Sequence, residues 1–182
     1  MIIIRNARFA DARPVAAIYG HHVLNGLGTF EEEPPGTTEM ASRIEAVLKR
    51  GLPYLVAEEA GVVAGFAYAS PLRPRAAYRY TAEDSVYVAP DRVGKGVGKA
   101  LVGRVIEHCE GMGLRQMIAV IGDSGNAGSI GLHRSLGFEQ VGVLSAVGYK
   151  FGRWVDTVWM QRALNAGQGS EPDAPGLDLK GG

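Results

Sequence analysis

The fold of this chain is set by Ser85-Val86-Tyr87-Val88-Ala89-Pro90-Asp91-Arg92-Val93-Gly94-Lys95-Gly96-Val97-Gly98-Lys99-Ala100-Leu101. This stretch reads as a strand, a turn, a glycine-rich loop and the first turn of a helix. Its alternating glycines remove the Cβ atoms that would hold an anion away from the backbone, so several N–H groups can converge at a positive helix N-terminus. Two lysines add charge beside them. The stretch therefore predicts a phosphate cradle.

Two familiar phosphate loops do not fit this spacing. A P-loop needs glycine where Val93 stands, and it needs a Ser or Thr hydroxyl for magnesium where Ala100 stands. A dinucleotide-binding loop needs its third glycine at the position of Lys99, and an acidic residue roughly 20 positions later. An enzyme that binds nucleotide phosphates is therefore disfavoured. An ordinary glycine-rich turn without a ligand stays open as the alternative to a phosphate-binding loop.

Composition bounds the class of protein. The chain has 182 residues, of which 46% are hydrophobic and 21% are charged, as in one compact soluble domain. Its 19 basic and 19 acidic residues cancel, which gives no electrostatic case for binding nucleic acid or an anionic membrane. The N-terminal run 1–5 is too short for a signal peptide, and no apolar run nears the roughly 20 residues of a membrane span. We expect a cytoplasmic protein. The single cysteine, Cys109, reads as a packed helical residue.

Hydrophobic periodicity predicts elements in the order β, α, α, β, β, β, α, β, α, β, β, which indicates an α/β fold with one mixed sheet. The predicted strands lie at 2–5, within a hairpin over 52–69, and at 81–88, 116–121, 141–151 and 157–161. The predicted helices begin after a cap at Asp11, at Thr38, at Gly98 and after Ser124 or Asn126. Residues 1–164 form the predicted domain, and the Gly-, Pro- and acid-rich residues 165–182 form a predicted flexible tail.

The strand, the pattern x-x-Gly-x-Gly-x-Gly and the apolar helix resemble the pyrophosphate loop of the GCN5-related N-acetyltransferases, which bind acetyl-coenzyme A. The element order is similar to theirs as well. The resemblance implies the acyl-CoA N-acyltransferase fold, a single mixed, mostly antiparallel central sheet flanked by helices, with acetyl-CoA as co-substrate and no metal. That family usually carries Arg or Gln where Val93 stands, with Arg92 one position earlier here, so backbone N–H groups would hold most of the pyrophosphate.

A closer resemblance covers residues 2–161. The segments that carry it are Phe30-Glu31, Leu72-Arg73-Pro74-Arg75, Tyr78-Arg79-Tyr80, Glu83-Asp84-Ser85-Val86-Tyr87-Val88 and Gly148-Tyr149-Lys150-Phe151-Gly152-Arg153-Trp154-Val155-Asp156-Thr157. Together they resemble the phosphinothricin N-acetyltransferase subfamily, which acetylates the α-amino group of L-amino acids such as phosphinothricin, methionine sulfoximine and methionine sulfone. The resemblance implies that reaction here, and a homodimer whose interface includes the late hairpin.

Acyl transfer to an amine needs a polarised thioester carbonyl and a path for the departing proton. In the resembled family a glutamate at the position of Glu83 is the base, acting through water; here it could instead pair with an arginine. A backbone N–H of Val86, Tyr87 or Val88 would polarise the carbonyl. His133 stands where many members carry tyrosine, and would protonate the leaving thiolate or contact the cofactor.

The remaining candidates bind rather than react. We expect the cofactor to contact Val86, Tyr87, Val88, Val93, Gly94, Lys95, Gly96, Val97, Gly98, Lys99, Asn126 and Ser135, although Asn126 could be only a helix cap. The substrate carboxylate would be held by Arg73 and Arg75, unless these are solvated loop arginines. The predicted acceptor pocket is completed by Phe30, Glu31 and Tyr80, with Phe30 as core the alternative.

Two other functions stay open. An acetyltransferase of the same chemistry would act on another small amine or on a protein N-terminus, and an open groove rather than a small closed pocket would favour it. A non-catalytic acyl-CoA binding module would keep the glycine loop and lose the chemistry. Glu83 and the strand Val86-Tyr87-Val88 argue against that module.

Overall fold

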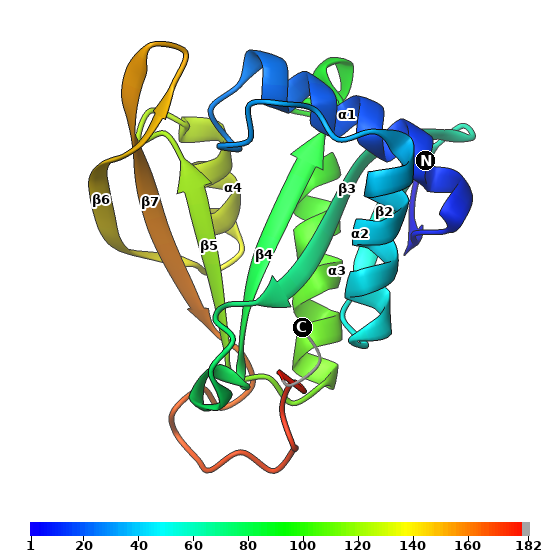
Figure 1. The fold of residues 1–182 in the computed structure, drawn as a ribbon. Helices are drawn as coiled ribbons and strands as arrows, with labels where there is room; N and C mark the ends of the chain where they lie inside the picture. Colours follow the sequence, from blue (N-terminus) through cyan, green and yellow to red (C-terminus); the bar gives the residue numbers. More distant parts are fainter. Residues whose placement is uncertain (180–182) are drawn as a thin grey trace.

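A computed structural model describes residues 1–179, and within them the chain forms one seven-stranded sheet in the order β1-β2-β3-β4-β5-β7-β6 (Figure 1). Among these described strands, only the pair β4–β5 is parallel. The predicted mixed, mostly antiparallel sheet is confirmed, with a longer final hairpin than expected. The strands are β1 Ile2–Asn6, β2 Tyr54–Glu59, β3 Val62–Pro71, β4 Thr81–Val88, β5 Gln116–Gly122, β6 Glu139–Lys150 and β7 Arg153–Ala163.

Helices cover both faces of the sheet. One face carries α1 (Ala12–Asn25) and α2 (Thr37–Lys49), and the other carries α3 (Val97–Gly111) and α4 (Ala127–Ser135) (Figure 1). An apolar core lies on each face of the sheet, between the strands and the helices that cover them. The central strands contribute to both cores because successive side chains point to opposite faces. Short 3-10 turns precede α1, β4 and α3 at η1 (Phe9–Asp11), η2 (Ala76–Tyr78) and η3 (Pro90–Arg92). No helix within residues 1–179 is long and apolar enough to cross a membrane.

The start of α1 differs from the expectation that the Asp11 side chain caps this helix. Asp11 occupies the N-cap position, but its carboxylate makes no cap bond to α1. It accepts the N–H of Arg8 at 2.7 Å and the guanidinium of Arg5 at 2.7 and 2.8 Å. The carboxylate therefore fixes η1 and joins it to β1. Its hydrogen bond with Arg5 holds the pKa of Asp11 below the ordinary value, against the effect of burial.

The parallel strands β4 and β5 pair along only part of their length. Their register runs from Thr81 opposite Gln116 to Asp84 opposite Ala119, although β4 continues to Val88 and β5 to Gly122. Beyond this register the strands diverge (Figure 1). We call the opening the fork. Backbone groups inside a sheet that have no neighbouring strand need another partner, so the fork is a natural place for a ligand.

The C-terminal segment 165–179 lies against the domain. The buried Arg115 guanidinium donates to the Glu171 carbonyl at 2.7 Å, and the Tyr80 hydroxyl donates to the Ala174 carbonyl at 2.8 Å. Leu177 is 7% exposed and joins the core beneath α3. The boundary after residue 164 and the flexibility of the tail stay predictions, and residues 180–182 lie outside the described residues.

Gly65→Ala is expected to destabilise the sheet beside the fork. A Cβ there would lie 2.9 Å from the Tyr87 carbonyl oxygen and 3.1 Å from Val97 Cγ1, so the backbone of β4 would have to shift, at a cost of about 1–3 kcal/mol. Gly103→Ala in α3 is the matched control, because a Cβ there meets nothing within 4 Å. Helix propensity predicts that the control raises the free energy of unfolding by about 0.5–1 kcal/mol. Urea unfolding measures both variants, and equal destabilisation would contradict this account.

Candidate functional site

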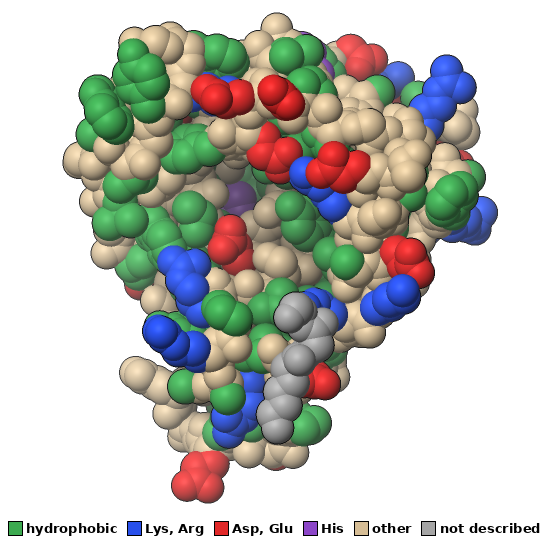
Figure 2. All heavy atoms as spheres, viewed as in Figure 1, with side chains coloured by type: hydrophobic (Ala, Val, Ile, Leu, Met, Phe, Trp, Pro, Cys, Tyr) green, Lys and Arg blue, Asp and Glu red, His purple; other side chains and the backbone are tan. Residues whose placement is uncertain are grey.

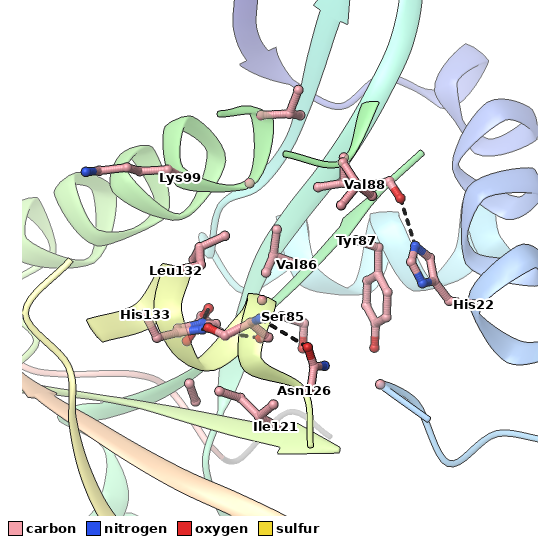
Figure 3. Close-up of a pocket in the computed structure, with 18 of the residues that line it drawn as sticks. His22, Ser85, Val86, Tyr87, Val88, Lys99, Ile121, Asn126, Leu132 and His133 are labelled. Atoms are coloured by element: carbon pink, nitrogen blue, oxygen red, sulfur yellow. Dashed lines mark hydrogen bonds and ion pairs between the residues drawn. The ribbon is translucent and has the colours of Figure 1, made fainter. Parts of the chain in front are cut away.

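A groove of about 480 Å³ occupies the fork (Figure 3). It runs from the glycine loop, between β4 and the end of β5, to α4. It therefore gathers residues that are far apart in the sequence. The predicted cofactor residues along it, with the predicted acid, are Val86, Tyr87, Val88, Val93, Gly94, Gly96, Val97, Gly98, Lys99, Asn126, His133 and Ser135.

The glycines of the loop serve two purposes. Gly94 and Gly96 have φ angles of +77° and +81°, a left-handed conformation that glycine adopts without steric cost, and a Cβ at either position would meet nothing within 4 Å. They turn the loop so that α3 begins at the groove. Gly98 is different, because its Cβ would lie 2.6 Å from Leu132 Cδ1. This third glycine allows α3 to approach α4.

Positive charge at this end of the groove comes from the helix and from two side chains. Lys99 lies in the first turn of α3 and lines the groove, as does Arg92, whose guanidinium pairs with Glu59 at 2.7 Å. The predicted contact Lys95 lies outside the lining, and its ammonium donates to the Asp91 carbonyl at 2.9 Å. The N-terminus of α3 adds the partial charge of its free N–H groups. An anionic group fits here.

Backbone donors line the groove along β4. The N–H of Ala89 donates to the Ala64 carbonyl at 2.9 Å, which fixes the alternation of hydrogen bonds between β4 and β3. By that alternation the N–H groups of Val86 and Val88 point away from β3, into the fork. The Val88 carbonyl also points away from β3, because it accepts a hydrogen bond from His22 Nε2 at 2.8 Å. The groove thus offers two N–H donors that no neighbouring strand uses.

A buried ion pair stands at the base of the fork. The side chains of Asp84 and His133 are 0% and 3% exposed, and Asp84 Oδ2 lies 3.0 Å from His133 Nε2. His133 Nδ1 donates to the Ser129 carbonyl at 2.8 Å. Burial lowers the pKa of His133, but the hydrogen bond and charge of Asp84 together with the Ser129 carbonyl outweigh burial and raise it above 6.5. Asp84 Oδ1 is the one buried side-chain polar atom without a partner among residues 1–179.

The two other candidates on α4 have local partners. Asn126 is the N-cap of the helix, and its Oδ1 accepts the Ser129 N–H at 3.1 Å. It also lines the groove, so the cap and the predicted cofactor contact are compatible. The Ser135 hydroxyl donates to the Leu132 carbonyl at 2.8 Å at the groove's edge.

Glu83, the predicted base, precedes Asp84 and therefore lies on the opposite face of β4, where Tyr87 packs against Tyr19 of α1. It is half-buried, and it does not line the groove of the fork. Burial raises the pKa of the Glu83 carboxyl and the charge of Asp84 adds to this, while Arg73 opposes both. Figure 2 shows that this face is hollowed near its centre. A raised pKa makes a carboxylate a stronger proton acceptor, as a general base requires.

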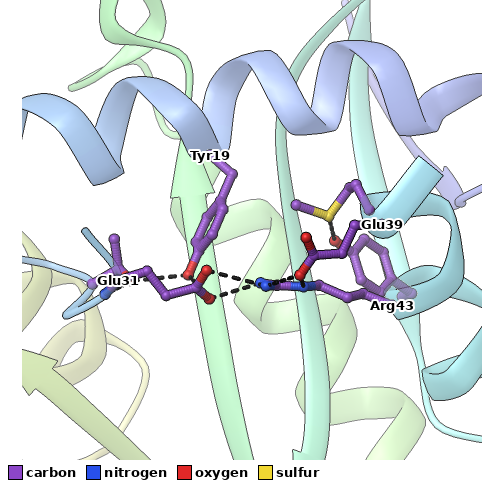
Figure 4. Close-up of polar contacts among 7 residues, drawn as sticks. Tyr19, Glu31, Glu39 and Arg43 are labelled. Carbon is purple, nitrogen blue, oxygen red and sulfur yellow. Dashed lines mark hydrogen bonds and ion pairs between the residues drawn. The ribbon is translucent and has the colours of Figure 1, made fainter. Parts of the chain in front are cut away.

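Glu31, a residue of the predicted acceptor pocket, already has partners (Figure 4). Its carboxylate accepts two hydrogen bonds from the Arg43 guanidinium, at 2.7 and 3.1 Å, and one from the Tyr19 hydroxyl at 2.8 Å. The Arg43 guanidinium holds the pKa of Glu31 below its ordinary value. Phe30, beside it, packs against Gly148 of β6. The network ties the segment between α1 and α2 to both helices.

The other substrate candidates lie toward the opposite end of β4. Arg73 is exposed, with its guanidinium 5.9 Å from the centre of the Trp159 ring. Arg75 is also exposed, just before η2. Tyr80 faces the C-terminal segment and donates to the Ala174 carbonyl, so the structure does not gather it with Phe30. The substrate roles of these residues stay predictions.

Several residues of the groove were missed by reasoning from the sequence: His22, Gly28, Asp84, Ser129 and the end of β5. Most carry no motif. Asp84 did carry a signal, because the predicted strand placed its side chain on the same face as Ala82 and Val86, where a buried carboxylate needs a partner. Among residues 1–179, no three His, Cys, Asp or Glu side chains gather as a metal site.

Comparison with known proteins identifies the family. The model of the acetyltransferase (GNAT) family matches residues 20–138. The chain belongs to the GNAT family. Phosphinothricin N-acetyltransferase of Alcaligenes faecalis is 56% identical over 93% of this chain and 86% of its own length. An L-methionine sulfoximine/L-methionine sulfone acetyltransferase of Pseudomonas paraeruginosa is 44% identical over 89% of this chain and 94% of its own.

Solved structures agree with this assignment. The crystal structure of a GNAT superfamily phosphinothricin acetyltransferase from Sinorhizobium meliloti, in complex with AcCoA, superimposes with a TM-score of 0.90 at 48% identity. The match covers 94% of this chain and 92% of that one. The family resemblance and the fold that were inferred from the sequence are therefore confirmed.

Asp84→Asn is expected to lower the pKa of His133. Without the carboxylate, burial dominates and favours the neutral ring. Because the folded pKa lies above 6.5, the pair contributes stability that is present below pH 6.5 and is lost as pH rises through the folded pKa. The variant should lack this pH dependence. NMR titration of the His133 ring, assigned with a His133→Gln variant, measures the pKa, and an unchanged value would contradict the pairing.

Proposed function

We propose that this chain is an acetyl-CoA-dependent N-acetyltransferase that acetylates the α-amino group of small L-amino acids such as phosphinothricin, methionine sulfoximine and methionine sulfone. The groove in the fork carries the proposal, because it joins a glycine loop, unpaired N–H groups and a buried His133 in one continuous channel. The two relatives described above that are named for these substrates are 56% and 44% identical to this chain over the aligned residues. The co-substrate is acetyl-CoA, the molecule bound in the Sinorhizobium meliloti structure.

The residues of the groove fit acetyl-CoA. The open backbone around Gly94 and Gly96, with Lys99 and the helix N-terminus, would hold the pyrophosphate. The N–H groups of Val86 and Val88 would bind the arm of the cofactor and polarise the thioester carbonyl. Donors that are already aligned for the developing oxyanion lower the barrier, since they need no reorientation during reaction.

Glu83 would remove the proton of the attacking amine, directly or through a water. The amine nitrogen bonds to the acetyl carbon, the carbon–sulfur bond breaks, and the proton passes to the Glu83 carboxylate. We assign His133 to the sulfur end, where its positive charge stabilises the departing thiolate. Its two ring N–H groups already bond Ser129 and Asp84, so delivery of a proton to sulfur requires the Asp84 bond to break.

The acceptor would enter from the face opposite α3 and α4. Glu31 bonds to Tyr19 of α1 on that side of the sheet, Phe30 precedes it, and Glu83 shares this face of β4 by the alternation of the strand. We assign the substrate carboxylate to the exposed Arg73 and Arg75, with Arg73 near enough to Glu83 to affect its pKa. Tyr80 stays a predicted contact, and a cytoplasmic location also stays a prediction.

Glu83→Gln should lose about 10²–10⁴-fold of the turnover rate at neutral pH, the usual contribution of a general base. Because Glu83 accepts a proton only when ionised, the native rate should rise as pH passes its raised pKa, and the variant should lack that rise. The control is Glu107→Gln, an exposed carboxylate on α3 that pairs with Arg104. Thiol release from acetyl-CoA measures the rate for each variant.

The same assay separates the competing functions. The acceptors compared are phosphinothricin, methionine sulfoximine, methionine sulfone, common L-amino acids and a short peptide. Acetylation of the peptide alone would shift the assignment to a protein N-terminus. If the chain binds acetyl-CoA but acetylates no amine, the result would contradict the proposed enzymatic activity and would favour a non-catalytic acyl-CoA binding module.

We also propose that the chain forms a homodimer through the β6–β7 hairpin. Large apolar side chains are exposed on it at Val141, Val143, Val147, Tyr149, Phe151 and Trp154. Figure 2 shows hydrophobic side chains over this hairpin, on the left side of the molecule. An exposed apolar patch of this extent is typical of a protein interface. The zero net charge places no strong repulsion between two copies.

Trp154→Asp combined with Val147→Asp should convert the dimer to a monomer, because each change places an unpaired carboxylate in the buried interface. The control is Phe9→Asp, an exposed aromatic residue of η1 away from the hairpin. Light scattering after size-exclusion chromatography measures the mass. A native monomer, or a dimer that persists in the double variant, would contradict the proposal.

A further inference from the structure

Lys150 is a charged residue in a buried position. It ends β6 and is 2% exposed, although lysine is rarely buried without a partner. Its ammonium donates to the Gly26 carbonyl at 2.9 Å and to the Thr29 carbonyl at 2.8 Å. It also lies 4.9 Å from the centre of the Phe151 ring. Both hydrogen-bond partners are backbone carbonyl oxygens of another segment, so the Lys150 ammonium attaches that segment to β6.

The two bonded carbonyls lie on either side of a residue of the groove. Gly26 and Thr29 enclose Gly28, which lines the groove opposite β4. The turn between them also presses on β5, because a Cβ at Gly122 would lie 2.0 Å from the Leu27 carbonyl oxygen. The turn 26–29 is thus fixed from two sides, by direct backbone contact with β5 and by the ammonium from β6.

The same face of β6 also seats the next residue of the segment. Gly148 precedes Lys150 by two positions and therefore shares its face of the strand. A Cβ at Gly148 would lie 2.3 Å from Phe30 Cε2, so the aromatic ring occupies the space that this glycine leaves. The Thr29 side chain continues the connection, because its Oγ1 lies 2.8 Å from the Tyr19 hydroxyl, which in turn donates to Glu31. Gly148 and Lys150 together form the seat of residues 26–31.

We propose that Lys150 is a positioning residue for the acceptor amine, which acts by fixing residues 26–31 at the edge of the substrate hollow. The inference rests on the proposed function, because Phe30 and Glu31 border the acceptor there. An ammonium can hold two carbonyl oxygens at once with aligned donors, whereas an apolar side chain of the same length holds neither. Without the hydrogen bonds from Lys150, the turn 26–29 would no longer be attached to β6, and the Phe30 ring would lose its fixed position against Gly148.

Lys150→Met keeps the length of the side chain and removes the donors. We expect kcat/KM for the amino-acid acceptor to fall about ten- to a hundredfold, because a misplaced amine attacks more slowly, while the KM for acetyl-CoA changes far less, since only Gly28 of the turn lines the groove. The glycine loop that would hold the pyrophosphate is a separate segment that includes Gly94 and Gly96, and none of the Lys150 hydrogen bonds reaches it. The matched control is Lys49→Met, an exposed lysine of α2 that pairs with Glu45. A fall in kcat in proportion to the folded fraction, with both KM values unchanged, would mean a purely structural role and overturn the proposal.

Hydrogen exchange gives a second reading that needs no turnover. In Lys150→Met the amides of residues 26–31 should exchange faster, while the exchange of the α3 amides stays as in the native chain. If the native chain acetylates no amine, the proposed function fails, yet exchange still tests the seat. Unchanged exchange in residues 26–31 would overturn the seat itself. If Lys150→Met does not fold, Lys150→Gln, which keeps a donor on a shorter side chain, is measured in the same way.

Discussion

The rest of the site depends on one interruption in backbone hydrogen bonding. The strands β4 and β5 stop pairing at Asp84 and Ala119, in the middle of a sheet that is otherwise continuous. Unpaired N–H and C=O groups inside a protein are costly, so the opening must be held by other contacts. The Asp84–His133 pair stands at its base, and the turn carrying Leu27 presses on Gly122 at its far end. Binding of acetyl-CoA would supply the hydrogen bonds that the missing strand contact leaves out.

In the proposed mechanism, two consecutive carboxylates on β4 act on opposite faces of the sheet. Asp84 points toward α4 and holds His133 at the groove, and Glu83 points toward α1 and the hollow. Strand alternation alone separates them. Burial and the neighbouring charge of Asp84 raise the pKa of Glu83, so the aspartate would serve both the cofactor side and the proposed base.

Much of this arrangement could be predicted from the sequence, because its signals are local. The glycine spacing and the apolar helix that follows it predicted the loop, and β4 was placed at its observed bounds, Thr81–Val88. The contacts between distant segments could not be predicted. Nothing in the sequence near Lys150 indicates that its ammonium reaches Thr29, and nothing near Tyr80 indicates that it faces Ala174. The two roles of the glycines, turning the loop and admitting Leu132, also depend on packing between helices.

The central claim is that the fork presents free backbone donors to acetyl-CoA, and amide hydrogen exchange along β4 tests it most directly. In the free chain the Val86 and Val88 amides should exchange faster than those of Ser85 and Tyr87, which pair with β3 by the alternation of the strand. Saturation with acetyl-CoA should slow exchange at Val86 and Val88 and leave Ser85 and Tyr87 unchanged. Acetyl-CoA binding that leaves the exchange of Val86 and Val88 unaltered would contradict the account.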